Sequence, residues 1–243
     1  MKIEQLNWDT GFFGIKIGKL LVDNEIDFNN KIFKEQLNDE KYQLVYVFKF
    51  REMFSWPTVI NSGIELTDIM LTMSQKFNAE ENINTKYNFR NELTDDELNK
   101  CYSLAEATSV FSRFNKEAKI GPAKTRELYR KWIDNAINKS FADGLFLFKN
   151  DESVEGVSVI KTDEKNKIGY CSMNGVNANF KGHGIGKNLW QQACGYWATE
   201  KKITLCKVSF SLQNPESFNF HLRLGFNKIE EIKYIYHFRS KGC

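Results

Sequence analysis

Residues 176–187 read VNANFKGHGIGK and lead from a predicted strand directly into a long amphipathic helix. A glycine-rich turn at the start of a helix lets several backbone N–H groups converge on one point, where the helix dipole adds positive potential. Lys181 and Lys187 add positive charge on either side of the glycines. The segment therefore predicts a phosphate-binding turn, and the alternative is a tight strand-to-helix turn that binds no ligand.

Two well-known phosphate motifs do not fit this turn. A P-loop requires Ser or Thr after Gly-Lys, but Asn188 follows Lys187, and Lys181 stands where the first glycine of that motif belongs. A dinucleotide-binding fingerprint requires a third glycine at the position of Lys187. The turn is therefore neither a P-loop nor a Rossmann fingerprint.

The composition is that of an ordinary globular protein. The chain has 243 residues, 42% hydrophobic and 27% charged, with 20 Phe, 9 Tyr and 5 Trp. That aromatic content excludes a disordered or low-complexity chain. The length fits one large domain, or a small domain followed by one of standard size.

Charge and hydropathy limit the partners. The net charge is +3, and basic and acidic residues alternate along the chain, so we expect no nucleic-acid binding. No stretch approaches the roughly 20 apolar residues of a membrane span, and Glu4 and Asp9 interrupt the N-terminal segment where a signal peptide needs an apolar run. The sequence predicts a cytoplasmic protein that does not bind membranes.

The cysteines predict reduced thiols that bind no metal. They are odd in number, widely spaced and without a C-x-x-C pair, and the chain has only three His. Each is expected to pack as a small apolar side chain. The five positions are Cys101, Cys171, Cys194, Cys206 and Cys243.

The first third predicts a small mixed α/β domain that ends near residue 85. Residues 6–21 contain three glycines and predict extended chain broken by a turn. Asn29 and Asn30 are candidate caps of a helix that continues to Lys41. Strands are predicted at 43–50 and 64–77, before a polar linker at 78–86.

The remainder predicts helices and a strand meander. Apolar residues recur at helical spacing in 95–107, 123–138, 185–200 and 216–224. Strands are predicted at 145–148, 153–162, 167–174, 204–211 and 228–238. The first three of these strands follow one another with short polar turns, so they predict an antiparallel meander.

The residues of the glycine turn resemble the acetyl-CoA signature of the GNAT N-acyltransferase superfamily, roughly V-x-P-x-[YF]-[RQ]-G-x-G-[IL]-[GA]-x-x-L. The matching residues are Val176, Phe180, Lys181, Gly182, Gly184, Ile185, Gly186 and Leu189. The chain departs from the signature at Ala178, where Pro is common, and at Lys181, where Arg or Gln is usual. Asn214, Ser217 and residues 224–226 (LGF) resemble later family motifs, and the resemblance covers residues 86–238.

The resemblance implies a fold and a cofactor. The expected fold is α+β, a mixed but mostly antiparallel sheet flanked by helices, with a smaller N-terminal α/β domain at 1–85 and a catalytic domain at 86–243. The expected cofactor is coenzyme A, with acyl-CoA as co-substrate and no metal. Its expected contacts are Val176, Lys181, Gly182, His183, Gly184, Ile185, Gly186, Lys187, Asn214 and Ser217.

A narrower resemblance concerns the acceptor. Residues 6–14 (LNWDTGFFG), 112–114 (SRF) and 128–133 (LYRKWI) resemble the two-domain GNAT enzymes that acylate nucleotide-linked aminodeoxysugars, such as dTDP-fucosamine acetyltransferase, in polysaccharide biosynthesis. The resemblance implies substrate contacts at Phe12, Arg113, Tyr129 and Trp132. A guanidinium can form paired hydrogen bonds with a diphosphate, whereas the aromatic residues have core packing as their alternative role.

Two residues are expected to take part in the chemistry that the resemblance implies. The strand that ends near Val176 is expected to splay from its neighbour, so that a backbone N–H within residues 174–176, at Asn174 or close to it, polarises the thioester carbonyl. His221 occupies the position of the family's usual acid, a Tyr, and the ordinary pKa of histidine is about 6.5. The alternative for His221 is a structural, hydrogen-bonding role. The general base stays open among Glu106, Asp95 and Asp9.

The sequence therefore predicts an acyl-CoA-dependent N-acyltransferase. It moves an acetyl or short hydroxyacyl group to the amine of a nucleotide-linked, dTDP-type aminosugar by direct attack in a ternary complex. One alternative is a CoA-binding module without catalysis, and another is a protein or peptide N-acetyltransferase. The expected partner is this small-molecule substrate, and a homodimer stays open.

Overall fold

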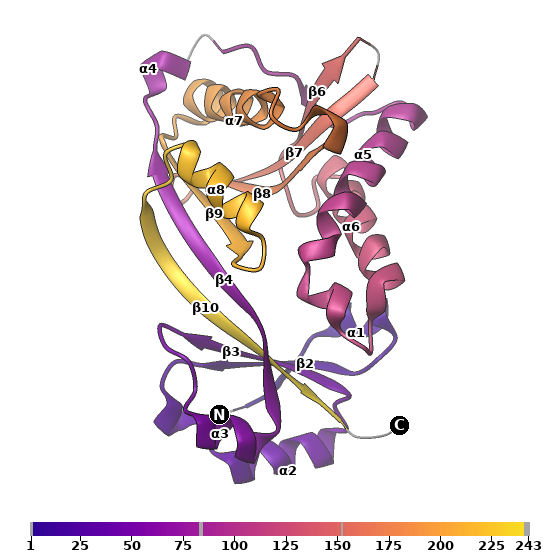
Figure 1. The fold of residues 1–243 in the computed structure, drawn as a ribbon, viewed down its shortest axis with the longest axis vertical. Coiled ribbons are helices and arrows are strands. Elements are labelled where there is room, and N and C mark those ends of the chain that lie inside the picture. The colour runs from indigo at the N-terminus through magenta and orange to yellow at the C-terminus, as the bar shows by residue number, and fades with distance from the viewer. Residues whose placement is uncertain (1, 83–84, 152, 241–243) are drawn as a thin grey trace. The chain divides into compact units, whose positions relative to one another are not determined.

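The computed structural model describes residues 2–82, 85–151 and 153–240 (Figure 1). The chain forms two compact units. The first contains Met1–Thr72, Phe210–Pro215 and Ile229–Cys243, and the second contains Met73–Ser209 and Glu216–Lys228. The sequence predicted one boundary near residue 85, whereas the two units alternate along the chain. They do so because the last strand of the chain pairs with a strand of the first unit.

The first unit is built on strands from both ends of the chain. They are β1 (Glu4–Gln5), β2 (Ile17–Val22), β3 (Leu44–Phe50), β10 (Lys228–Arg239) and the first part of β4 (Ile64–Lys76). β2 and β3 run parallel, whereas β1 pairs with β2 and β10 pairs with β3 in antiparallel register. The helices are α1 (Asn7–Phe13), the 3-10 turn η1 (Glu25–Asp27), α2 (Asn30–Glu40) and α3 (Trp56–Ser62).

The helix predicted after Asn29 is confirmed. The Asn29 side chain accepts hydrogen bonds from the backbone N–H groups of Lys31 and Ile32, at 3.0 and 3.1 Å. This cap satisfies donors that have no partner inside the helix. Phe33 and Leu37 lie one turn apart and are buried in the core of the first unit, which explains why this segment is helical.

The prediction of extended chain at residues 6–21 was wrong for its first half, because α1 is a helix. Trp8 and Phe12 lie one turn apart and stack at 5.0 Å between ring centroids. Gly14 ends the helix with a φ of 71°, a left-handed conformation that glycine adopts without strain. The glycines of this segment were interpreted as strand breakers, but Gly14 is a helix C-cap.

The second unit contains the rest of the sheet. Its strands are β5 (Phe89–Arg90), β6 (Gly144–Asn150), β7 (Ser153–Asp163), β8 (Ile168–Val176), β9 (Leu205–Ser211) and the end of β4. β5 to β8 pair antiparallel in sequence order, which confirms the predicted meander, and β8 pairs with β9 in parallel. The expected mixed, mostly antiparallel sheet flanked by helices is therefore confirmed.

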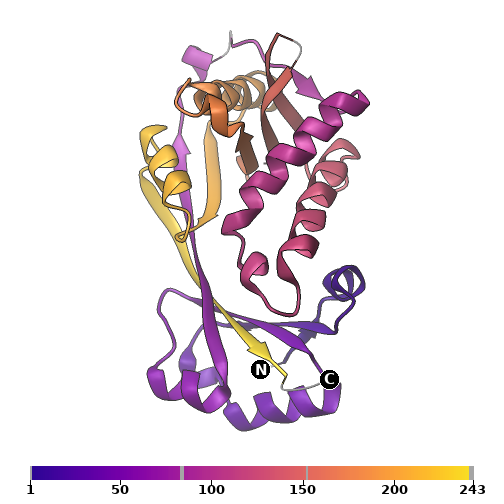
Figure 2. The ribbon, with the colours of Figure 1, turned by 45° about the vertical axis from the view of Figure 1, so that its right-hand side comes forward.

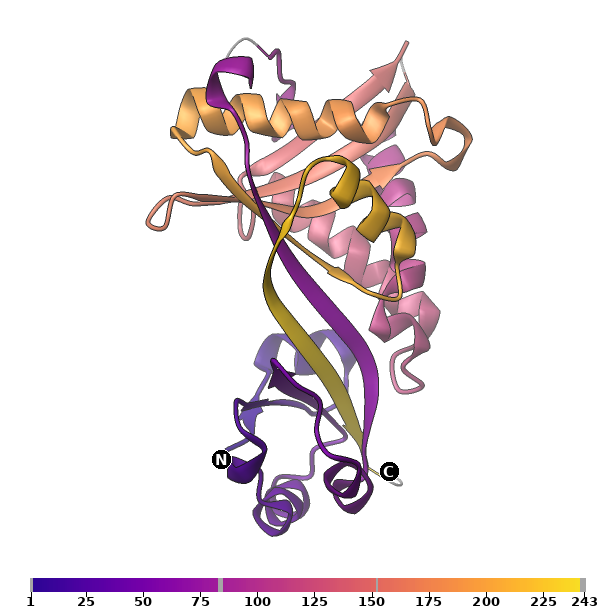
Figure 3. The same ribbon diagram turned by 60° about the vertical axis from the view of Figure 1, so that its left-hand side comes forward.

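Helices cover both faces of this sheet. They are α4 (Ala79–Asn82), α5 (Asp95–Thr108), α6 (Gly121–Ile137), α7 (Ile185–Tyr196), which ends in a π turn, and α8 (Pro215–Arg223). Short 3-10 turns are η2 (Ser109–Phe111), η3 (Arg113–Lys116) and η4 (Ala178–Phe180). Figures 2 and 3 show α5 and α6 on one face and α7 on the other.

Close packing fixes α7 against the sheet. A Cβ atom placed on Gly156 of β7 would lie 2.6 Å from Ile185 Cγ2. On Gly169 of β8 it would lie 2.4 Å from the Trp197 ring. The two glycines therefore let this helix lie directly on the strands, which sets the position of its N-terminus.

Four cysteines are buried side chains of the second unit. Burial raises the pKa of Cys101 and of Cys171 to about 12, so both thiols stay protonated at neutral pH. Cys194 and Cys206 are buried in the same way, and Cys243 lies outside the described residues. No helix within 2–82, 85–151 and 153–240 has the length and apolar character to cross a membrane.

Candidate active site

The glycine turn takes the conformation that its sequence requires. It connects β8 to α7 through η4, and Gly182 and Gly184 have φ angles of 86° and 79°. Side chains rarely adopt this left-handed region. A Cβ atom at either glycine would meet nothing within 4 Å, so the demand for glycine comes from the backbone angle and not from crowding.

The start of α7 presents backbone donors without acceptors. Its N-cap is Gly184, which has no side chain to cap the helix, and the first intrahelical bond runs from Asn188 N to Gly184 O at 2.9 Å. Within the described residues, no group accepts from the N–H of Ile185, Gly186 or Lys187. These donors lie at the positive end of the helix dipole, so the turn can bind an anionic oxygen.

Two side chains of the turn, Lys181 and His183, contact neighbouring groups. Lys181 Nζ forms an ion pair with Glu216 at 2.6 Å, where α8 begins. His183 Nδ1 lies 3.2 Å from the carbonyl oxygen of Lys181, and Lys187 is exposed. A Cβ atom on Gly186 would lie 2.9 Å from the Phe220 ring, so this glycine lets α8 approach α7.

A buried carboxylate anchors the strand that enters the turn. Glu155 of β7 is 6% exposed, and its carboxylate accepts a hydrogen bond from Asn177 Nδ2 at 2.5 Å. Its carbonyl accepts from Asn177 N at 2.9 Å. Asn177 Oδ1 in turn accepts from Asn179 N and caps η4. Neither Glu155 nor Asn177 was predicted from the sequence, because their contact depends on the β7–β8 register.

A β-bulge opens the sheet beside the turn. Val159 pairs with Met173 and Ile160 with Cys171, so Ser172 is an extra residue in β8. The parallel pairing of β8 with β9 extends only to Cys171 opposite Val208 among the described residues. The strand that was expected to splay therefore separates from β9 at its bulge.

Backbone groups of β8 point into this opening. Asn177 donates to the carbonyl of Glu155, and bonded and non-bonded pairs alternate in an antiparallel ladder. Val176 and Asn174, opposite Gly156 and Ser158, are therefore non-bonded positions whose N–H groups face away from β7. The predicted place for a carbonyl-polarising N–H, near Asn174, lies on this edge.

His221 lies in α8, where it is buried. It is 4% exposed, its Nδ1 lies 2.7 Å from the carbonyl oxygen of Ser217, and its ring packs edge-on against Phe226. Burial lowers its pKa to about 4, although the bond to Ser217 opposes the shift. The ring is therefore neutral at pH 7, which does not suit a group that must donate a proton.

The other predicted CoA contacts lie on two segments. Ser217 is in α8 of the second unit, with its hydroxyl 3.3 Å from His221 Nδ1. Asn214 belongs to the segment 210–215 of the first unit, where its N–H donates to Ser211 O at 3.0 Å. Their contact with a cofactor stays a prediction.

The predicted acceptor contacts lie on separate elements. Arg113 is in η3, and its guanidinium lies 4.1 Å from the centre of the Phe114 ring. Tyr129 and Trp132 of α6 contact each other at 4.5 Å, and Tyr129 packs against the core of the second unit. Phe12 belongs to α1 of the first unit. Their role in binding an acceptor stays a prediction.

Residues 99–226 match the model of the acetyltransferase (GNAT) family. The chain therefore belongs to this family and is an acyl-CoA-dependent N-acyltransferase. No curated protein matches it. The described residues contain no group of His, Cys, Asp and Glu side chains placed to hold a metal ion.

Solved structures share the fold at low sequence identity. A conserved protein of unknown function from Staphylococcus epidermidis is 14% identical, with a TM-score of 0.59 over 93% of this chain and 85% of its own. A GCN5-related N-acetyltransferase from Sphaerobacter thermophilus is 13% identical, with a TM-score of 0.52 over 86% and 66%. One from Kribbella flavida is 10% identical, with a TM-score of 0.52 over 93% and 82%.

Proposed function

We propose that the protein transfers an acetyl or short hydroxyacyl group from acyl-CoA to the amine of a nucleotide-linked aminodeoxysugar. The use of acyl-CoA as donor rests on two neighbouring backbone features. They are the N–H groups at the start of α7, which have no acceptor among the described residues, and the edge of β8 that does not pair with β9. The acceptor half is supported by residues 6–14, 112–114 and 128–133, which resemble the aminosugar enzymes.

The backbone fits the chemistry of a thioester donor. The N–H groups of Ile185, Gly186 and Lys187 would hold the pyrophosphate of CoA, and the edge of β8 would bind its pantetheine arm. The N–H of Asn174 would donate to the thioester carbonyl oxygen and stabilise the negative charge that develops there. Positioning an amine against this carbonyl supplies most of the acceleration that such a reaction needs.

The reaction needs two proton transfers besides acyl transfer. The neutral amine attacks the carbonyl carbon, a C–N bond forms, and the C–S bond breaks as the thiolate leaves. The nitrogen loses one proton and the thiolate gains one. A thiolate whose conjugate acid has a pKa of about 8.5 is a fair leaving group, so water can return this proton without help from His221.

Thiol release from acetyl-CoA tests the proposal. The protein is assayed with a dTDP-linked aminosugar, the same aminosugar without its nucleotide, and a peptide with a free N-terminus. We expect turnover with the first acceptor and little with the other two. Equal rates with the free sugar would contradict the nucleotide-sugar assignment. CoA binding without thiol release from any acceptor would favour the non-catalytic alternative.

A further inference from the structure

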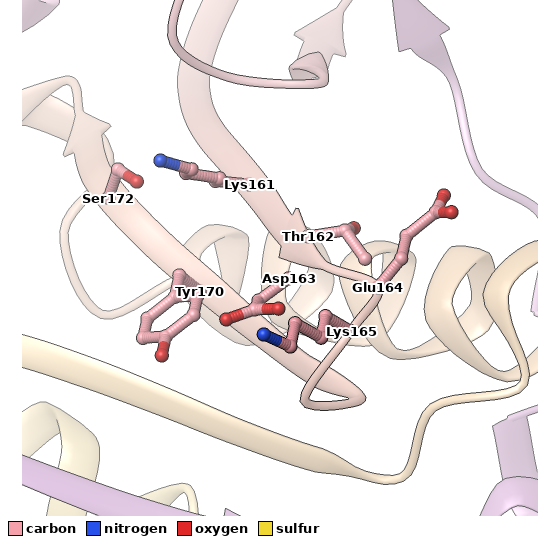
Figure 4. Close-up of a pocket in the computed structure, with 7 residues that line it drawn as sticks. All are labelled: Lys161, Thr162, Asp163, Glu164, Lys165, Tyr170 and Ser172. Atoms are coloured by element: carbon pink, nitrogen blue, oxygen red, sulfur yellow. The ribbon is translucent and has the colours of Figure 1, made fainter.

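A shallow cavity of about 670 Å³ lies at the β7–β8 hairpin, toward the end of β8 that is far from the phosphate turn (Figure 4). All of its lining residues belong to the second unit. They are Lys161, Thr162, Asp163, Glu164, Lys165, Tyr170 and Ser172. None of them was predicted as a site residue from the sequence.

A basic and aromatic row crosses this part of the sheet. Tyr170 pairs with Lys161 of β7 on one side and with Lys207 of β9 on the other. Side chains at paired positions lie on the same face with Cβ atoms about 5 Å apart. Tyr170 is half-buried and Lys161 is exposed, so the row brings a phenol ring and a lysine side chain to the surface of the sheet.

The acidic residues of the cavity already have partners. Glu164 forms an ion pair with Lys201 at 2.7 Å. Asp163 accepts from the backbone and side chain of Asn166, at 2.9 and 2.7 Å, and these bonds lower its pKa. By contrast, Lys161 forms no ion pair in the part of the chain that the structure describes. Lys161 is therefore the lining cation that no carboxylate of the described residues neutralises, whereas Lys165 lies close enough to Asp163 to help lower the pKa of that carboxyl group.

The cavity connects this charge to the opening of the sheet. Ser172 lines the cavity and is also the bulge residue at which β8 leaves β9. In Figure 4 the Lys161 side chain points toward Ser172. Tyr170 precedes Ser172 by two residues, which corresponds to about 7 Å along a strand.

We propose that this cavity binds the diphosphate of the acceptor, with Lys161 and Lys165 as its cationic partners and the acceptor amine directed toward Ser172. The inference rests on the proposed function and adds the position of the acceptor. It differs from the sequence-based assignment of the diphosphate to Arg113, which lies in the connection between α5 and α6.

Thymidine diphosphate is a suitable probe because it carries the diphosphate and needs no acyl transfer. The full chain is first saturated with CoA, which blocks the turn at α7, and is then titrated with the nucleotide by calorimetry. We expect Lys161→Ala to weaken its binding about tenfold, the lower end for a hydrogen bond to a charged group. Lys165→Ala should act in the same direction, and Lys161→Arg should restore part of the affinity.

Two controls separate this site from general charge effects. Lys100 is exposed on α5, so Lys100→Ala makes the same change of charge elsewhere and should leave nucleotide affinity unchanged. Arg113→Ala tests the competing assignment. The proposal is overturned if nucleotide binding survives both lysine substitutions, if it is lost only in Arg113→Ala, or if CoA-saturated protein binds no nucleotide.

Steady-state assays distinguish failure of the cavity proposal from failure of the proposed function. With a dTDP-linked aminosugar, Lys161→Ala should raise KM for the sugar nucleotide and leave KM for acetyl-CoA unchanged. Lysine-dependent nucleotide binding without turnover would support the cavity and contradict the proposed acceptor. Turnover with an unchanged KM in Lys161→Ala would support the acceptor and contradict the cavity.

Discussion

Asn177 donates two hydrogen bonds to Glu155, from Nδ2 to the buried carboxylate at 2.5 Å and from N to the carbonyl at 2.9 Å. The pair attaches the first residue after β8 to the neighbouring strand. Because Asn177 also caps η4, the contact fixes where the chain enters the glycine turn. Glu155 thus acts on the glycine turn by holding Asn177 in place.

We therefore expect Asn177→Ala to weaken CoA binding. The substitution removes a donor from a buried carboxylate, a loss that typically costs about 1 to 3 kcal/mol. Calorimetry should show a higher Kd for CoA, together with a lower Tm. Asn179→Ala is the matched control, since this neighbour is exposed and takes part through its backbone N–H, which alanine retains. Equal CoA affinity in both variants would contradict a positioning role for Asn177.

We expect Gly184→Val to abolish measurable CoA binding in a folded protein. Valine at a φ of 79° is strained, and relief of that strain would turn the N–H groups of α7 away from a common point. Gly63→Val is the control, because Gly63 ends α3 with a φ of 70° and lies in the first unit. It should lower Tm similarly and leave CoA affinity intact. An unchanged Kd for CoA in Gly184→Val would show that the turn is not part of the CoA site.

We expect His221 to contribute to stability and little to proton transfer. A pKa of about 4 leaves almost no imidazolium at pH 7, so His221→Phe should keep kcat within a few-fold of wild type. Loss of an essential acid would instead lower kcat by about 10²- to 10⁴-fold. A loss of that size in a folded His221→Phe variant, with both KM values unchanged, would establish the acid role that the sequence predicted.

The same histidine should make stability depend on pH. Its pKa in the folded chain, about 4, lies below the ordinary value of 6.5, so unfolding takes up a proton between these values. The contribution of the neutral ring to the free energy of unfolding is complete above pH 6.5. As the pH falls toward 4, this contribution decreases by up to about 3 kcal/mol. Urea titrations across this range should show a shallower decline for His221→Phe. An identical decline in wild type and variant would contradict this assignment.

A second pH effect should come from Glu97 at the start of α5. Its carboxylate is 5% exposed and accepts from Lys149 at 2.7 Å, from Thr94 N at 2.8 Å and from Arg90 at 2.9 Å. The bond to Lys149 makes the largest contribution to lowering its pKa to about 2, from an ordinary value of 4.5. The carboxylate therefore stabilises the fold above pH 4.5, and this stabilisation is lost as the pH falls toward 2.

Glu97→Gln should lower the free energy of unfolding at pH 7 by about 1 to 2 kcal/mol, because charged hydrogen bonds are lost. The difference from wild type should shrink as the pH falls below 4.5. Glu127→Gln is the control, since Glu127 is an exposed residue paired with Lys124 on α6 and should change stability little. A constant difference between wild type and Glu97→Gln from pH 7 to pH 3 would contradict the role of this charge.

The sequence was sufficient for features that depend on local pattern. The turn at Gly182 and Gly184, the helix that follows it and the cap at Asn29 are each encoded within a few neighbouring residues. The extra residue Ser172 and the contact between Glu155 and Asn177 depend on how two strands are aligned, which composition and periodicity do not specify. The burial of His221 also depends on tertiary packing, so its lowered pKa was not visible in an isolated helix pattern.

Strand β10 pairs with β3 from Lys233 opposite Phe50 to Arg239 opposite Leu44. On the ribosome, β3 is made about 190 residues before this partner, and at 5 to 20 residues per second the delay is about 10 to 40 s. During that interval the exposed edge of β3 is open to pairing with other chains or to chaperone binding. The part of the protein that is synthesised first is thus among the last to be completed.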